Sequence, residues 1–87
     1  MYWLRKLLGK QGPWAGIANR HAVIYWEGRR KMTIAGEMLD NGFQIYVASI
    51  TTWDDSKGEL ISESERQRIL QNVIHSLESQ GARVVID

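Results

Sequence analysis

The chain has 87 residues, of which 44% are hydrophobic and 24% charged. This amino-acid composition is ordinary for a globular protein, and the length suffices for one small domain. It has no cysteine, which excludes a disulfide framework and thiol chemistry. No stretch approaches the roughly 20 apolar residues that a membrane span needs. We therefore expect a soluble, cytoplasmic protein that is a monomer or a weak homodimer.

The net charge is only +1, but the charged residues are unevenly distributed. Residues 1–36 carry seven cations and one anion, whereas residues 37–65 carry seven anions and one cation. A split of this kind can steer association with a charged partner. The alternative is that the two halves interleave in the fold and the asymmetry disappears.

The first predicted element is a short helical segment over residues 2–8, where apolar residues recur at helical spacing. The break at residues 9–13 contains two glycines and the sole proline of the chain. It separates an N-terminal extension, residues 1–12, from a body that spans residues 14–87. We expect the whole chain to form a single domain.

A β-hairpin is the next predicted feature. Residues 22–26 are rich in β-branched and aromatic side chains, and residues 31–34 alternate between polar and apolar. The segment 27–29 contains a glycine and joins them as a short turn. An earlier strand is expected over residues 14–18, with a turn at residues 19–21.

A further strand is predicted over residues 43–48, after the turn signal Asp40-Asn41-Gly42. Residues 49–53 either prolong this strand or bend away from it, and a polar loop follows at residues 54–59. Alternation predicts two faces for the strand, with Phe43, Ile45 and Val47 on one and Gln44, Tyr46 and Ala48 on the other.

The clearest signal in the sequence is a helix over about residues 63–80. Ser62 and Glu65 have the spacing of a capping box, in which each side chain binds a backbone N–H of the other residue. Gly81 stands where a helix usually ends in a left-handed residue, and residues 82–86 form a last strand. One apolar stripe runs along the helix: Ile69, Leu70, Val73, Ile74 and Leu77.

This element order predicts the α+β class. Consecutive strands with short turns favour a small antiparallel sheet, a meander of three to four strands. The long helix supplies an apolar stripe that covers one face of this sheet. The C-terminal strand is expected to add to the sheet edge after the helix crosses back.

No catalytic residue, metal site or cofactor site is predicted. His21 and His75 have no neighbours at metal-ligand spacing, and no nucleophile motif or phosphate-binding loop occurs. The adjacent Asp54 and Asp55 lack the oxygen-rich pattern of a calcium loop. A small ribonuclease-like site built on His21 is a third alternative for the function, although no spacing supports it.

The aromatic content is high, with four tryptophans and three tyrosines. Tyr25 and Trp26 are adjacent in a predicted strand and should point to opposite faces, one into the core and one outward. We expect about two of the four tryptophans to serve the core. Tryptophan and tyrosine are also enriched in the energetically dominant residues of protein interfaces.

One alternative function is a nucleic-acid-binding module on the hairpin. Cations would contact phosphates and aromatic rings would stack on bases. The sequence pI of about 8.1 is lower than the pI above about 9 that is usual for nucleic-acid-binding domains, so nucleic acid is the less favoured partner. The residues concerned are Tyr25, Trp26, Arg29, Arg30 and Lys31.

Several segments resemble a family of small bacterial immunity proteins, catalogued as immunity protein 74. The strongest is the hairpin Ile24-Tyr25-Trp26-Glu27-Gly28-Arg29-Arg30-Lys31-Met32-Thr33-Ile34, which is followed by Gly36-Glu37-Met38-Leu39. The others are Ile45-Tyr46-Val47-Ala48-Ser49-Ile50 with Trp53, then Leu60-Ile61-Ser62-Glu63, and finally Gly81-Ala82-Arg83-Val84-Val85. The resemblance covers roughly residues 20–86.

The resemblance implies a cytoplasmic antidote, found in polymorphic-toxin and contact-dependent inhibition systems, that binds a cognate toxin domain and blocks its active site. Many such toxins are nucleases with basic surfaces. Acidic side chains of the chain's middle would then mimic phosphate, and aromatic anchors would supply the central contact. From the residues themselves we predict the partner-binding set Glu37, Asp40, Tyr46, Trp53, Asp54, Asp55 and Glu59.

Overall fold

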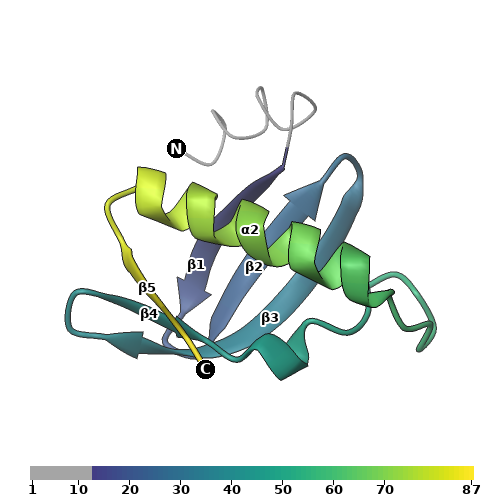
Figure 1. The fold of residues 1–87 in the computed structure, drawn as a ribbon, viewed down its shortest axis with the longest axis horizontal. Coiled ribbons are helices and arrows are strands. Elements are labelled where there is room, and N and C mark those ends of the chain that lie inside the picture. The colour runs from purple at the N-terminus through teal and green to yellow at the C-terminus, as the bar shows by residue number, and fades with distance from the viewer. Residues whose placement is uncertain (1–12) are drawn as a thin grey trace.

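The computed structural model describes residues 13–87, and the predicted helical segment at residues 2–8 lies outside the described residues. A twisted sheet forms one layer, and a single long helix runs across one of its faces as the other layer (Figure 1). The α+β prediction is confirmed. None of the helices in residues 13–87 has both the length and the apolar composition to cross a bilayer.

The sheet has five strands in the order β1-β2-β3-β4-β5. The first four form an antiparallel meander, as predicted, and the last strand returns after the helix to pair in parallel with β4 at the sheet edge. Their bounds are β1 Trp14–Asn19, β2 Ala22–Glu27, β3 Arg30–Leu39, β4 Gly42–Ile45 and β5 Arg83–Ile86.

The fourth strand is shorter than the sequence predicts. It ends at Ile45, and Val47–Ser49 forms a 3₁₀ helix instead of continuing the strand. The hydroxyl of Ser49 explains the bend, since it accepts a hydrogen bond from the Ala35 N–H and donates one to the Tyr46 carbonyl. The prediction of a strand to residue 48 is therefore wrong. The Ser49 side chain binds the Ala35 N–H, which a continued strand would have bound through a backbone carbonyl.

The long helix, α2, spans Glu63–Ser79 and matches the predicted position. Ser62 caps it by accepting a hydrogen bond from the Glu65 N–H. The reciprocal half of the predicted capping box is replaced, because the Glu65 carboxylate reaches Trp53 and Arg68. Gly81 has φ +94°, the left-handed conformation expected after the helix end.

The core lies between α2 and the inner face of the sheet. Strand alternation sends every second side chain of β2, β3 and β4 inward, and the predicted helix stripe covers them. Ile74 of that stripe is partly buried and packs against the others. The fully buried side chains include Val23, Tyr25, Met32, Ile34, Phe43, Ile45, Ile69 and Val73.

Candidate functional site

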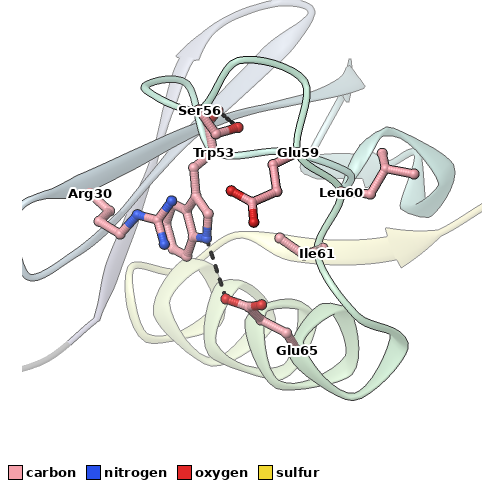
Figure 2. A pocket seen from close by; sticks show the side chains of 7 residues that line it. All are labelled: Arg30, Trp53, Ser56, Glu59, Leu60, Ile61 and Glu65. Carbon is pink, nitrogen blue, oxygen red and sulfur yellow. Dashed lines mark hydrogen bonds between the residues drawn. The ribbon is translucent and has the colours of Figure 1, made fainter.

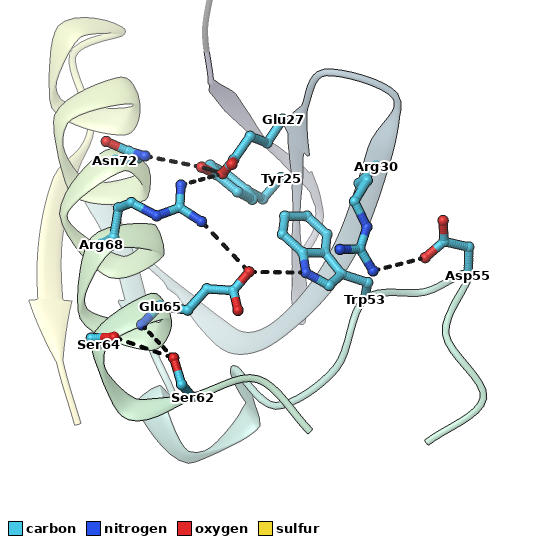
Figure 3. Close-up of polar contacts among 10 residues, drawn as sticks. All are labelled: Tyr25, Glu27, Arg30, Trp53, Asp55, Ser62, Ser64, Glu65, Arg68 and Asn72. Carbon is cyan, nitrogen blue, oxygen red and sulfur yellow. Dashed lines mark hydrogen bonds and ion pairs between the residues drawn. The ribbon is translucent and has the colours of Figure 1, made fainter. Parts of the chain in front are cut away.

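Trp53 contacts residues of three different segments. Its side chain is only 4% exposed, and its ring stacks on Tyr25 at a centroid distance of 6.0 Å. The guanidinium of Arg30 lies over the same ring, 4.5 Å from its centroid. The indole N–H donates to the Glu65 carboxylate at 3.3 Å (Figure 3). Trp53 therefore ties the loop before α2 to the β2–β3 hairpin and to the first turn of the helix.

A second set of polar contacts joins β2 to the helix beside this ring. The Tyr25 hydroxyl donates to Glu27 at 2.7 Å and accepts from the Asn72 amide at 3.0 Å. Arg68 donates to the same Glu27 carboxylate at 2.6 Å (Figure 3). Since each group has a complementary partner, this network holds the helix in a fixed register on the hairpin.

The electrostatics of the network follow from burial and hydrogen bonding. Burial and the hydrogen bond to Glu27 raise the pKa of Tyr25 to about 12. Burial alone would raise the pKa of Glu27, but the hydrogen bonds from Arg68 and Tyr25 outweigh it and lower that pKa. The hydrogen bond to Glu27 raises the pKa of Arg68. At neutral pH Glu27 and Arg68 thus form an ion pair beside a protonated tyrosine.

Asp54, predicted to contact a partner, is bound to the sheet. Its carboxylate accepts hydrogen bonds from the N–H and the hydroxyl of Thr33, at 2.9 and 2.7 Å. Its own N–H donates to the Lys31 carbonyl at 2.8 Å. These bonds continue the ladder along β3 beyond the end of β4, so Asp54 protects backbone groups that would otherwise form an open edge.

Asp55 and Glu59, from the same loop, lie exposed at its surface. An Asp55 carboxylate oxygen is 3.5 Å from the guanidinium of Arg30, the side chain that also lies over the Trp53 ring. Glu59 has no hydrogen-bond or ion-pair partner among residues 13–87. Of the four predicted loop residues, Glu59 is thus the one whose charge no described side chain compensates.

A hollow of about 120 Å³ opens between this loop and the start of α2. We call it the loop–helix hollow. The carboxylates of Glu59 and Glu65 line it together with Trp53, Leu60 and Ile61, and Arg30 closes one side (Figure 2). Leu60 is 73% exposed, the most exposed large hydrophobic side chain of residues 13–87. The hollow thus has a mainly polar lining that includes two carboxylates and the exposed Leu60.

The other three predicted partner-binding residues lie elsewhere. Asp40 is exposed in the β3–β4 turn, at the opposite end of the sheet from the 54–61 loop (Figure 1). Glu37 is paired with Gln44 across β3 and β4, and its carboxylate lies 3.5 Å from the His21 Nδ1. Tyr46 is half-buried just before the 3₁₀ helix. The predicted set therefore does not form one patch, and its toxin contacts stay a prediction.

The hairpin residues of the nucleic-acid alternative are also dispersed. Tyr25 is fully buried, so its ring offers no surface for base stacking. Trp26 lies on the opposite face, as predicted, with its ring centroid 5.2 Å from that of Trp14. Arg30 is engaged by Trp53, whereas Lys31 is exposed next to Trp26 in the register. Arg29 is exposed in the turn with Gly28.

No group of three or more His, Cys, Asp or Glu side chains in residues 13–87 is arranged to hold a metal ion. His21 is exposed beside Glu37, and His75 is exposed on α2. Within this part of the chain, neither histidine has a second histidine or a cysteine in a cluster that could bind a metal. The third alternative, an enzyme built on His21, gains no supporting geometry.

A family model described as Immunity protein 74 matches residues 18–87, most of the chain. The chain belongs to the Immunity protein 74 family. Searches of curated proteins and of solved structures found no match. The family match includes the hairpin, the 54–61 loop and α2, so the loop–helix hollow of this immunity protein lies wholly within the matched region.

Sequence reasoning missed several residues that organise the site of this immunity protein. Arg68 and Asn72 sit one and two helical turns after Ser64, on the flank of the apolar stripe that faces the hairpin. Both are polar residues that border the predicted apolar stripe. That position indicated that polar groups of another element would lie opposite them. Leu60 was visible only as an apolar residue after a polar loop, and a single residue of this kind is no signal of a binding site.

Proposed function

We propose that this immunity protein binds a toxin domain encoded beside it and neutralises that toxin by covering its active site. Family membership supports the immunity role, and the 54–61 loop supplies the observation that carries the binding mode. That loop presents Asp55, Glu59 and Leu60 at the surface of an otherwise firmly anchored segment. Anchored loops lose little conformational entropy on binding, which favours affinity.

We propose further that the toxin is a nuclease delivered by contact-dependent inhibition. A nuclease must present cations to the phosphates of its substrate, because phosphate contacts dominate nucleic-acid affinity. Carboxylates on the antidote can meet the same cations, and complementary charge accelerates encounter and fixes register. Glu59 has no partner among residues 13–87, which supports this role. We place this interaction in the cytoplasm, where the nucleic acid to be protected lies.

The test is co-expression with the toxin domain encoded by the adjacent gene. Cells that express the toxin domain alone should stop growing, and this protein should restore growth and co-purify with the toxin. Purified toxin should cleave RNA or DNA, and an equimolar amount of the immunity protein should abolish cleavage. A neighbouring gene product that is harmless to cells, or a toxin that stays fully active in its presence, would contradict the proposal.

A further inference from the structure

The loop–helix hollow has an excess of acidic charge that residues 13–87 do not compensate. The three arginines around it are each matched with an anion: Arg30 with Asp55, Arg66 with Glu63 and Arg68 with Glu27. Arg68 also lies 3.6 Å from Glu65, so Glu27 and Glu65 share one cation, whereas Glu59 has no ion-pair partner among residues 13–87. Glu59 and Glu65 both line the hollow. The nearby Lys57 is exposed in the loop and does not line it. The interior of the hollow is therefore net acidic.

The shape of the hollow limits what can enter it. Its volume of about 120 Å³ is well below the roughly 300–1,000 Å³ of small-molecule sites, so it suits one side chain. Glu59 lies beside Trp53, Glu65 is hydrogen-bonded to the Trp53 indole, and Leu60 and Ile61 supply the apolar part of a mainly polar lining (Figure 2). A long aliphatic stem that ends in a cation matches the apolar and the acidic side chains of this lining.

We infer that the loop–helix hollow receives one arginine or lysine side chain of the toxin domain, with its stem against Leu60 and its cationic head at Glu59. This inference rests on the proposed function and specifies its central contact. Glu65 contributes charge but stays bonded to Trp53, so its carboxylate is already oriented. Arg30 also lines the hollow, but its guanidinium lies over the Trp53 ring and its charge is paired with Asp55.

The fold offers matched variants for the test. Glu59→Gln removes a charge that has no partner in the described part of the chain, so the fold of residues 13–87 should stay intact. Glu78→Gln makes the same change on an exposed residue at the far end of α2. Leu60→Ala shortens the exposed apolar side chain of the lining, and Met38→Ala truncates another exposed apolar side chain on β3. Glu65 is unsuitable, because its replacement would also release Trp53.

The experiment titrates each variant with the toxin domain from the adjacent gene, at low and at high salt. Glu59→Gln and Leu60→Ala should each raise the Kd about tenfold, and Glu59→Gln should also flatten the salt dependence. Both control variants should stay within about twofold of the wild type. In a double-mutant cycle, Glu59→Gln should have no further effect once the matching toxin arginine or lysine is replaced.

Three results would overturn the inference, and they can be distinguished from one another. Wild-type affinity in both Glu59→Gln and Leu60→Ala, with toxin protection intact, rejects the hollow as the contact while the immunity function stands. A wild-type protein that does not bind the toxin domain rejects the proposed function and the inference together. A Kd that rises equally in Glu78→Gln would show a long-range charge effect and would also reject a specific contact in the hollow.

Discussion

Asp54 accepts two hydrogen bonds from Thr33, one from the backbone N–H at 2.9 Å and one from the hydroxyl at 2.7 Å. The two residues are 21 positions apart, and their contact fixes where the 54–61 loop leaves the sheet. Asp54 thus anchors the start of the segment that carries Asp55, Glu59 and Leu60. Its predicted contact with a partner stays a prediction.

Replacing Asp54 should destabilise the domain, whereas replacing its neighbour should not. Asp54→Ala removes two charge-assisted hydrogen bonds to β3, and we expect the free energy of unfolding to fall by about 1–2 kcal/mol. Asp55→Ala removes only an exposed ion pair with Arg30 and should cost less than about 0.5 kcal/mol. Urea unfolding measures both. Equal stability of the two variants would show that the Thr33 contacts contribute nothing measurable.

Ser76 protects the outer edge of the first strand. Its hydroxyl is buried, accepts from the Ala15 N–H at 2.9 Å and donates to the Ala15 carbonyl at 3.1 Å. Ser76→Ala leaves that N–H without its partner, so we expect a loss of about 1–3 kcal/mol. Ser79→Ala, which removes a local bond within α2, is the control and should be nearly neutral. Hydrogen exchange at the Ala15 amide should accelerate in Ser76→Ala alone.

Gly42 permits the close approach of β4 and β5. A Cβ at this position would collide with the backbone carbonyl of Arg83, which cannot move without breaking the parallel pairing. We expect Gly42→Ala to cost more than about 2 kcal/mol and to detach β5. Gly28→Ala meets no atom within 4 Å but forces a side chain to φ +62°, so it should cost about 1 kcal/mol. Unfolding experiments and NMR signals of β5 distinguish these two outcomes.

Stability should decline at alkaline pH through Tyr25. Burial and the bond to Glu27 raise its pKa from 10.0 to about 12, so the folded state keeps its proton after the unfolded chain loses it. Stability from this source is complete below pH 10 and is lost as pH rises through about 12, by about 3 kcal/mol in total. Absorbance titration of tyrosinate should therefore show one late-titrating group that Tyr25→Phe removes. Loss of an early-titrating group in that variant would contradict the assignment.

Local sequence determined most of the secondary structure. The Ser62 cap and the apolar stripe located α2, because capping and helical periodicity depend on residues only a few positions apart. Alternation in the hairpin separated Tyr25 from Trp26 correctly, since successive strand residues must point to opposite faces. The same local patterns indicated the meander and the returning last strand.

Contacts between distant segments decided the rest. Local alternation continued β4 to residue 48, but the Ser49 hydroxyl ended it through the Ala35 N–H of another strand. Asp54, Asp55 and Glu59 look equivalent in the sequence, yet Thr33 binds the first and Arg30 the second. Only the tertiary structure could show that, of these three carboxylates, Glu59 has no partner within residues 13–87, because a carboxylate's availability depends on which donors the fold brings within hydrogen-bonding distance.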